Sequence, residues 1–158
     1  MKVKDIEGNL DKRELSFILS TDKIVSVNQL YNARVGRKGG KAYPIIYKSP
    51  AAVKFTEEVE EQLLTLDFKE LAPWIWEVDY FDMTVNFILN SNFNARDTSN
   101  GIKLMEDCVF RHLGLNDSRV LSWHAWKSFL PKAREELICV RISESTFNYK
   151  FDDLGVNS

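Results

Sequence analysis

The chain has 158 residues, which is enough for one domain with a single hydrophobic core. Hydrophobic residues make up 44% and charged residues 28% of the sequence, a composition that excludes a disordered chain. The net charge of −2 and the isoelectric point of about 5.7 argue against a protein that coats DNA nonspecifically, because such proteins are strongly basic.

The sequence carries no membrane or zinc pattern. No apolar stretch approaches the roughly 20 residues that span a bilayer, and residues 1–15 lack the apolar centre of a signal peptide. A cytoplasmic protein without membrane association is therefore expected. Cys108 and Cys139 stand in apolar patterns and are expected to be core thiols, and without a CxxC or HExxH motif no zinc site is expected.

The first third of the chain is polar and basic. Residues 1–13 are expected to form a polar arm, and residues 15–19 predict the first strand. Residues 34–48 hold five cations and no acid, whereas residues 57–79 hold eight acids and one base. The segment from Ser26 to Pro50, with its tip at Arg37–Lys41, is expected to be a loop, and a loop of that length inside a compact domain is usually functional or disordered.

The rest of the chain alternates helices and strands. A helix is predicted to start at Ser49-Pro50, and a second to run from 98 to 113, before Gly114. Strands are predicted at 78–89, 120–129 and 137–142. The order β–α–β–α–β–β predicts an α/β (α+β) fold: a mixed sheet with two main helices packed on it. The expected single domain covers residues 14–144, and a peripheral tail follows at 145–158.

Polar residues that could act in catalysis or bind a metal ion are concentrated between Asn94 and Val120. Asp97 ends a strand-to-helix loop, and Asn100, Lys103 and Asp107 follow on one helical face. Gly114 then reverses the chain, which can bring Asp117 near Asp107 or Asp97. Three carboxylates placed in this way could hold Mg²⁺, and a nearby lysine could stabilise the charge of a phosphoryl transition state.

An ordinary structural reading accounts for the same residues. Asp97 before Thr98 and Ser99 is a good helix N-cap. Lys103 and Asp107 form an i,i+4 pair of opposite charge, and Asp117 before Ser118 fits a turn. Spacing alone therefore leaves both readings open.

The whole stretch resembles the RusA family of Holliday junction resolvases. The family pattern runs loosely R-D-x-D-N-x-x-K, then a helix with an internal Asp, then Gly and D-D-x-x-V/I. The matching residues are Arg96, Asp97, Asn100, Lys103, Asp107, Gly114, Asp117 and Val120. Lys127 falls where the family often has a lysine on the following strand, and Val27–Tyr31 is similar to its upstream N-x-x-Y segment. The resemblance covers roughly residues 15–143.

The resemblance implies an Mg²⁺-dependent endonuclease, with Mn²⁺ as a possible substitute. Asp97, Asp107 and Asp117 would be the metal ligands, Lys103 the catalytic cation, and all four the catalytic residues. The substrate would be a four-way junction or related branched DNA, cut by a homodimer to leave a 5′-phosphate and a 3′-hydroxyl. The setting implied is phage or bacterial recombination and repair.

Two positions depart from the family pattern. Ser99 stands where the family has its second Asp, and Asn116 replaces the first Asp of the D-D pair. Both changes remove a negative charge from the expected site, and Glu106 lies one helical step from Asp107, in a direction not expected to reach it. A branched-DNA-binding protein without cleavage, and an interaction module with no nucleic-acid role, are therefore the alternatives.

Basic and aromatic residues predict the DNA contacts, because Lys and Arg bind phosphates and tyrosines pack on sugars or bases. The residues expected to contact nucleic acid are Asn28, Tyr31, Arg34, Arg37, Lys38, Lys41, Lys48, Arg96, Asn100 and Lys127. Trp123 and Trp126 lie three apart on a predicted strand and so point to opposite faces. One is expected in the core and the other in a dimer interface.

Overall fold

The computed structural model describes residues 5–25, 31–97 and 99–146. The strands are β1 (Asp5–Asn9), β2 (Glu14–Thr21), β3 (Tyr31–Lys38), β4 (Lys41–Lys48), β5 (Phe81–Leu89), β6 (Val120–Phe129) and β7 (Glu136–Glu144). The helices are α1 (Pro50–Leu63), α2 (Phe68–Leu71) and α3 (Ser99–Leu113), with short 3₁₀ turns η2 (Pro73–Trp76), η3 (Phe93–Ala95) and η4 (Asp117–Arg119).

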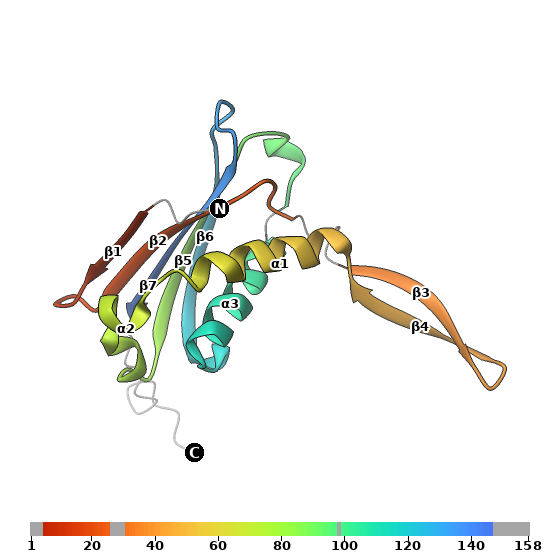
Figure 1. Cartoon of the computed structure of the whole chain (residues 1–158), viewed down its shortest axis with the longest axis horizontal. Helices are drawn as coiled ribbons and strands as arrows, with labels where there is room; N and C mark the ends of the chain where they lie inside the picture. Colours follow the sequence, from red (N-terminus) through yellow and green to blue (C-terminus); the bar gives the residue numbers. More distant parts are fainter. Residues whose placement is uncertain (1–4, 26–30, 98, 147–158) are drawn as a thin grey trace, which may run out of the picture.

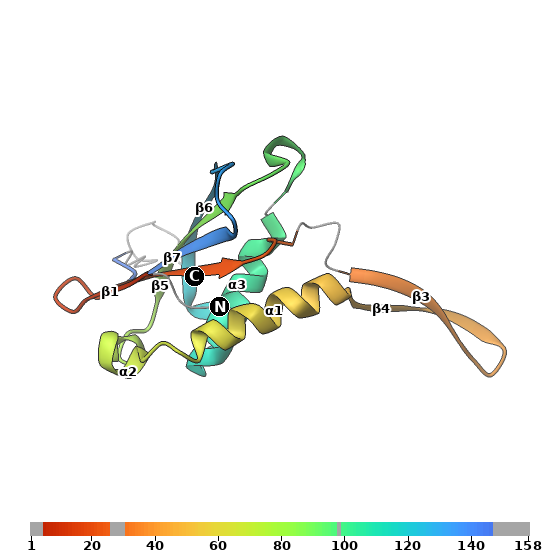
Figure 2. The ribbon, with the colours of Figure 1, turned by 45° about the horizontal axis from the view of Figure 1, so that its top comes forward.

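Five strands form one mixed sheet in the order β1-β2-β7-β5-β6. All neighbours in it are antiparallel except β5 and β6, which are parallel and are joined through α3. The two long helices, α1 and α3, lie side by side over one face of the sheet (Figures 1 and 2). The predicted mixed sheet with two main helices on it is confirmed.

The core lies between the helices and the sheet. Side chains alternate along β5, where Phe81, Met83, Val85, Phe87 and Leu89 are buried and the residues between them are half-buried. Apolar residues of α1 and α3 at helical spacing close the other side of this layer: Ala52, Phe55, Val59, Leu63, Met105 and Val109. The spacing of apolar residues along each strand or helix thus determines which of its faces is buried in the core.

Local signals set the helix boundaries. The Ser49 side chain accepts a hydrogen bond from the Ala52 amide at 3.1 Å and caps α1, as predicted. Gly114 follows α3 with a φ of 68°, the left-handed conformation that ends helices. Near the start of α3, Gly101 allows the helix to approach β5, since a Cβ there would lie 3.1 Å from the Phe87 ring.

Two segments differ from the sequence-based expectation. Residues 5–9, within the expected polar arm, form the edge strand β1, which pairs antiparallel with β2. The basic segment expected to be a loop is instead the hairpin β3–β4, a separate two-stranded sheet that extends away from the body (Figures 1 and 2). Gly39 and Gly40, with φ values of 58° and 77°, form its turn, and two such residues suit the type I′ turn of a tight hairpin.

Some expectations fall outside the described residues. Asn28 and most of the expected C-terminal tail, 147–158, belong there, as does Thr98. The helices of the described segments include none long and apolar enough to cross a bilayer.

Candidate functional site

Helix α3 and the turn after it build the candidate site. The apolar residues of α3 face the sheet, so Lys103 and Asp107, one turn apart, lie on its exposed side. The Leu115 amide then donates to the Phe110 carbonyl at 2.9 Å, which fixes the reversal of the chain after Gly114. The Asn116 side chain accepts from the Ser118 amide at 2.9 Å and caps η4, whose first residue is Asp117. Asp117 is thereby brought back to α3, as predicted.

Three carboxylates converge on the ammonium of Lys103. Its Nζ lies 3.1 Å from Oδ1 of Asp107 and 3.4 Å from Oε2 of Glu106, and it donates a short hydrogen bond to Asp117. The meeting of Asp107 and Asp117 was expected, but Glu106 was expected to point elsewhere. The i,i+3 spacing from Lys103 is the signal that could have placed Glu106 in the cluster.

Burial and pairing set the charges of this acidic cluster, formed by Lys103, Glu106, Asp107 and Asp117. The hydrogen bond to Asp117, followed by that to Asp107, raises the pKa of Lys103. The same bond to Lys103 lowers the pKa of Asp117. Glu106 is buried, and desolvation raises its pKa, although the Lys103 charge opposes the shift. At neutral pH, Lys103 is therefore a cation paired with an ionised Asp117 at the surface.

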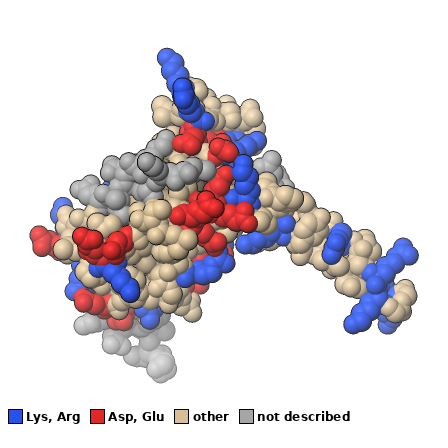
Figure 3. All heavy atoms as spheres, in the orientation of Figure 1, with Lys and Arg blue, Asp and Glu red and all other residues tan. Residues whose placement is uncertain are grey.

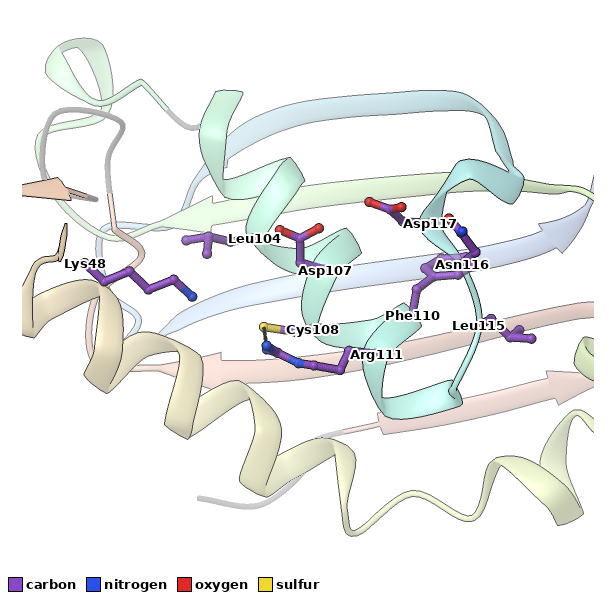
Figure 4. A pocket seen from close by; sticks show the side chains of 9 residues that line it. All are labelled: Lys48, Leu104, Asp107, Cys108, Phe110, Arg111, Leu115, Asn116 and Asp117. Atoms are coloured by element: carbon purple, nitrogen blue, oxygen red, sulfur yellow. Dashed lines mark hydrogen bonds between the residues drawn. The ribbon is translucent and has the colours of Figure 1, made fainter. Parts of the chain in front are cut away.

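A hollow of about 380 Å³ opens beside the acidic cluster. Asp107 and Asp117 line it, together with Arg111, which like Asp107 is on α3, and Lys48, which comes from β4 (Figure 4). Lys48 ends β4, so the base of the hairpin and the acidic cluster share one cavity. Arg111 was not expected here, although its spacing of four residues from Asp107 on α3 could have indicated it.

Asp97 occupies a different place. It lines a second hollow with Ile102, Trp126 and Lys127, while Asp107 and Asp117 line the first. Within the described ranges, no group of three or more His, Cys, Asp or Glu residues has an arrangement that would hold a metal ion. The expected convergence of three aspartates therefore reduces to two, Asp107 and Asp117.

This aspartate pair fits Mg²⁺ in one respect. Mg²⁺ is usually bound in proteins through one or two carboxylates, with water and substrate phosphates completing the octahedron. Asp107 and Asp117 are each more than one-third exposed and share one cation, the Lys103 ammonium. The donor set therefore suits a weakly held, hydrated ion more than a closed protein cage.

Arg96 does not present its guanidinium to the surface, contrary to the expectation that it contacts DNA. It is buried against Glu136, with Nη2 2.8 Å from Oε2, and it also donates to the carbonyl of Ile24. Lys127 is partly exposed, but its Nζ donates to the carbonyls of Phe93 at 2.7 Å and Arg96 at 2.8 Å. Both cations hold the loop that carries Asp97.

The other predicted DNA contacts whose side chains are described lie on the hairpin. Tyr31, Arg34, Arg37, Lys38 and Lys41 are all exposed there, and the Arg34 guanidinium lies 5.7 Å from the centre of the Tyr47 ring. Figure 3 shows lysine and arginine atoms gathered toward the free end of the hairpin. The structure gives no side-chain placement for Asn100.

Strand β6 forms an edge of the five-stranded sheet. The expectation that one of its two tryptophans lies in the core is wrong, because Trp123 is 59% and Trp126 44% exposed. Leu121, Phe129 and Leu130 are also about half exposed. The edge strand thus carries a row of large apolar side chains at the surface.

The comparisons with known proteins do not assign a family. No protein-family model and no curated protein matches the chain. The structure of IspF from Plasmodium falciparum in complex with CDP aligns with 73% of this chain and 92% of its own, at 12% sequence identity and a TM-score of 0.27. So low a TM-score supports no argument about this protein.

Proposed function

We propose that the protein is an Mg²⁺-dependent endonuclease that cuts branched DNA, with Asp107, Asp117 and Lys103 at its centre. The observation that carries the proposal is that Lys103 pairs with Asp107 and Asp117, and that these two aspartates line a cavity that Lys48 of the basic hairpin also lines. Carboxylates for a cation and lysines for phosphates thereby lie within one site. The resemblance of Arg96–Val120 to the RusA family supports the same reaction.

The residues of the site would have different roles in the reaction. Asp107 and Asp117 would hold Mg²⁺, which, when bound, supplies charge neutralisation at the phosphate and a lowered pKa for water. Lys103 would move from the aspartates to a non-bridging phosphate oxygen, where its charge stabilises the pentavalent transition state. Lys48 and Arg111 would anchor neighbouring phosphates in the cavity.

The proposed reaction is phosphodiester hydrolysis. The oxygen of a water molecule attacks phosphorus in line, and the bond from phosphorus to the 3′ oxygen breaks. The 3′ oxygen takes up a proton, and the water oxygen remains on the 5′-phosphate. Asp97, in the neighbouring hollow with Lys127, would lie beside the DNA strand rather than at the reacting phosphate.

A labelled four-way junction with Mg²⁺ or Mn²⁺ tests the proposal. Wild type should nick the junction, whereas Asp107→Asn, Asp117→Asn and Lys103→Ala should bind it and cut at least about a hundredfold more slowly, the scale of a lost electrostatic contact. Asp11→Asn, in the turn between β1 and β2 at the other edge of the sheet, is the matched control and should cut like wild type.

Binding without cleavage is the second candidate function. It is favoured because, among the described residues, no three or more His, Cys, Asp or Glu side chains are arranged to hold a metal ion, and because Ser99 and Asn116 stand in place of family aspartates. If wild type binds the junction in EDTA and never cuts with either metal, the protein is a branched-DNA-binding protein. If it neither binds nor cuts, the nucleic-acid proposal fails.

The proposed enzyme acts as a homodimer, and the edge of β6 supports this assembly. The strand has ten residues and no proline, so its outer edge is open to pairing. Antiparallel pairing of two copies about Ala125 would place Leu121 opposite Phe129 and Trp123 opposite Lys127. The exposed half of each aromatic side chain is roughly 100 Å². A stable interface buries roughly 800 Å² per partner, so the aromatic side chains would supply only part of that area and the rest of the strand edge and its neighbours would supply the remainder.

Light scattering after gel filtration tests the dimer. Wild type should have twice the 18.3 kDa mass of one chain, and Trp126→Glu should reduce it to a monomer, because a charge would be buried in the interface. Leu64→Glu, at an exposed apolar position after α1, is the control and should leave the mass unchanged. A monomeric wild type at tens of micromolar would contradict the dimer.

A further inference from the structure

The hairpin β3–β4 has two faces of different chemistry. Residues paired directly across the strands share a face, and faces alternate along each strand. One face contains the pairs Ala33–Ile46, Val35–Pro44 and Arg37–Ala42. The other contains the pairs Arg34–Ile45, Gly36–Tyr43 and Lys38–Lys41. The first face is an apolar strip bounded by Arg37 near the turn and by the Tyr31–Lys48 pair at the base. The second, which also contains Asn32–Tyr47, carries the other three cations and two tyrosines.

Side chains of the cationic face contact one another. A Cβ on Gly36 would lie 2.6 Å from Cδ1 of Ile45 and 2.8 Å from the Tyr43 ring, so these side chains cover the glycine. Arg34 lies over the Tyr47 ring on the same face. Its side chains therefore already have neighbours within the hairpin, and the charges stand at its surface.

The apolar strip is bare in comparison. Val35 is 70% and Ile46 71% exposed, and Ala33, Ala42 and Pro44 between and beside them are exposed as well. Ala33 pairs with Ile46 and Val35 with Pro44 across the two strands, and Ala42 lies two residues from Pro44 along β4. The apolar strip is therefore continuous. A continuous apolar strip on a projecting ribbon indicates a binding surface.

Charge identifies the class of partner. Residues 31–48 contain five cations and no acid. Lys38 and Lys41 face each other beside the turn, an arrangement that destabilises an isolated hairpin and is relieved by an anion. The hairpin base, Lys48, lines the same cavity as Asp107 and Asp117. A polyanion that reaches the acidic cluster therefore also passes along the hairpin.

We infer that the hairpin enters the branch point of the DNA, with its cationic face on the backbone and its apolar strip against unstacked bases. This inference rests on the proposed function and names the feature of the substrate that is recognised. A two-stranded ribbon fits a DNA groove roughly 12 Å wide, and apolar side chains that enter DNA stabilise unstacked base steps. Bases at a branch are partly unstacked, whereas those of a continuous duplex must be opened first.

Val35 and Ile46 are the residues to test. A junction with a fluorescent adenine analogue beside the branch, and a linear duplex with the same label, are titrated with protein in EDTA. Wild type should raise the fluorescence of the junction and not that of the duplex. The double variant Val35→Ser/Ile46→Ser should lose this rise, and its affinity ratio of junction to duplex should fall about tenfold, as expected for two lost apolar contacts.

Two further variants separate the faces. Lys38→Ala/Lys41→Ala should weaken junction and duplex binding alike and make the slope of log affinity against log salt shallower by about 2. Leu64→Ser, at a position 74% exposed on the body, should retain the wild-type ratio and fluorescence. Unchanged thermal unfolding of the variants, whose substituted side chains are exposed, confirms that the fold is intact.

The outcomes distinguish this inference from the proposed function. If wild type binds and cuts junctions while Val35→Ser/Ile46→Ser keeps the fluorescence rise and the affinity ratio, the inference is wrong and the nuclease stands. If the double variant loses binding to phosphatidylglycerol-containing vesicles but not the junction signal, the strip contacts lipid and the inference is wrong. If wild type binds neither DNA, both proposals fall.

Discussion

The buried ion pair between Arg96 and Glu136 gives the sharpest stability prediction. The Glu136 carboxylate accepts from the Ile24 amide at 2.7 Å, from the Asn90 amide at 3.3 Å and from the Arg96 guanidinium. The Glu136 side chain is 1% and that of Arg96 7% exposed. The pair thus ties the segment before the hairpin, the loop with Asp97 and strand β7 to one point.

Glu136→Gln should be strongly destabilising. It leaves the Arg96 charge buried without a counter-charge, which costs about 3–5 kcal/mol in comparable pairs. For a chain of this size, each kcal/mol lowers the melting temperature by about 2–4 °C, so a loss of about 10 °C is expected. Urea denaturation at pH 7 measures the free energy, and the midpoint should shift without a change in slope.

An exposed pair is the matched control. Asp22 lies 3.1 Å from Lys54, with both side chains about two-thirds exposed, so Asp22→Asn should leave the urea midpoint close to that of wild type, because solvent screens the pair. The double variant Arg96→Met/Glu136→Leu should be closer to wild type than Glu136→Gln, because no unpaired charge remains. If Glu136→Gln costs no more than Asp22→Asn, the pair does not stabilise the fold in the way argued.

Three further predictions concern helix α3. Burial lowers the pKa of His112 from its ordinary 6.5, and Glu60 only partly opposes this. Because the unfolded chain binds the proton more readily, the contribution of His112 to stability is complete above about pH 6.5 and is lost as the pH falls. His112→Gln should therefore flatten the fall in urea stability on acidification, and an unchanged slope would contradict the argument. Burial raises the pKa of the Cys108 thiol to about 11, so it should react slowly with a disulfide reagent at pH 8 until urea unfolds the chain; rapid labelling of native protein would refute this. Gly101→Ala places a Cβ 3.1 Å from the Phe87 ring and should cost about 1–3 kcal/mol by thermal unfolding, a loss that Phe87→Leu should reduce if the clash is its cause.

Patterns within single elements predicted most of the fold. The strand predicted at 120–129 and the helix predicted from 98 to 113 match β6 and α3 within one residue. Ser49-Pro50 and Gly114 marked helix ends, because capping depends on a few neighbouring residues. These signals are local, so one sequence suffices to read them.

The hairpin and β1 were missed for different reasons. Gly39-Gly40 between two runs of strand-forming residues is itself a hairpin signal, but the density of charge in the segment suggested a loop. Strand β1 consists of Asp5–Asn9, a short and polar sequence whose strand conformation comes from pairing with β2. Propensity is a poor guide to such an edge, because the tertiary partner determines it.

The candidate site was predicted only in part, because sequence patterns reveal contacts between neighbouring residues and not those between distant ones. Lys103, Asp107 and Asp117 are close in sequence, and one helix and one turn suffice to bring them together. Arg96 was misplaced because its partner, Glu136, lies forty residues away, a contact that no local pattern reveals. Asp97 shares the loop of Arg96 and is held with it in the second hollow.

The distribution of charge explains how an acidic protein could act on DNA. Three carboxylates around Lys103 would repel a phosphate if they stood alone, and the ammonium neutralises only part of their charge. The attraction must therefore come from elsewhere, and the hairpin holds five cations and no acid, of which Lys48 lines the cavity with Asp107 and Asp117. In the proposed mechanism, the hairpin would attract the DNA and α3 would bind the metal ion, and Lys48 at the base of the hairpin lies beside the cavity that Asp107 and Asp117 line. The net charge of −2 is then no argument against DNA binding, because the local potential along the hairpin, and not the average, acts on an approaching phosphate.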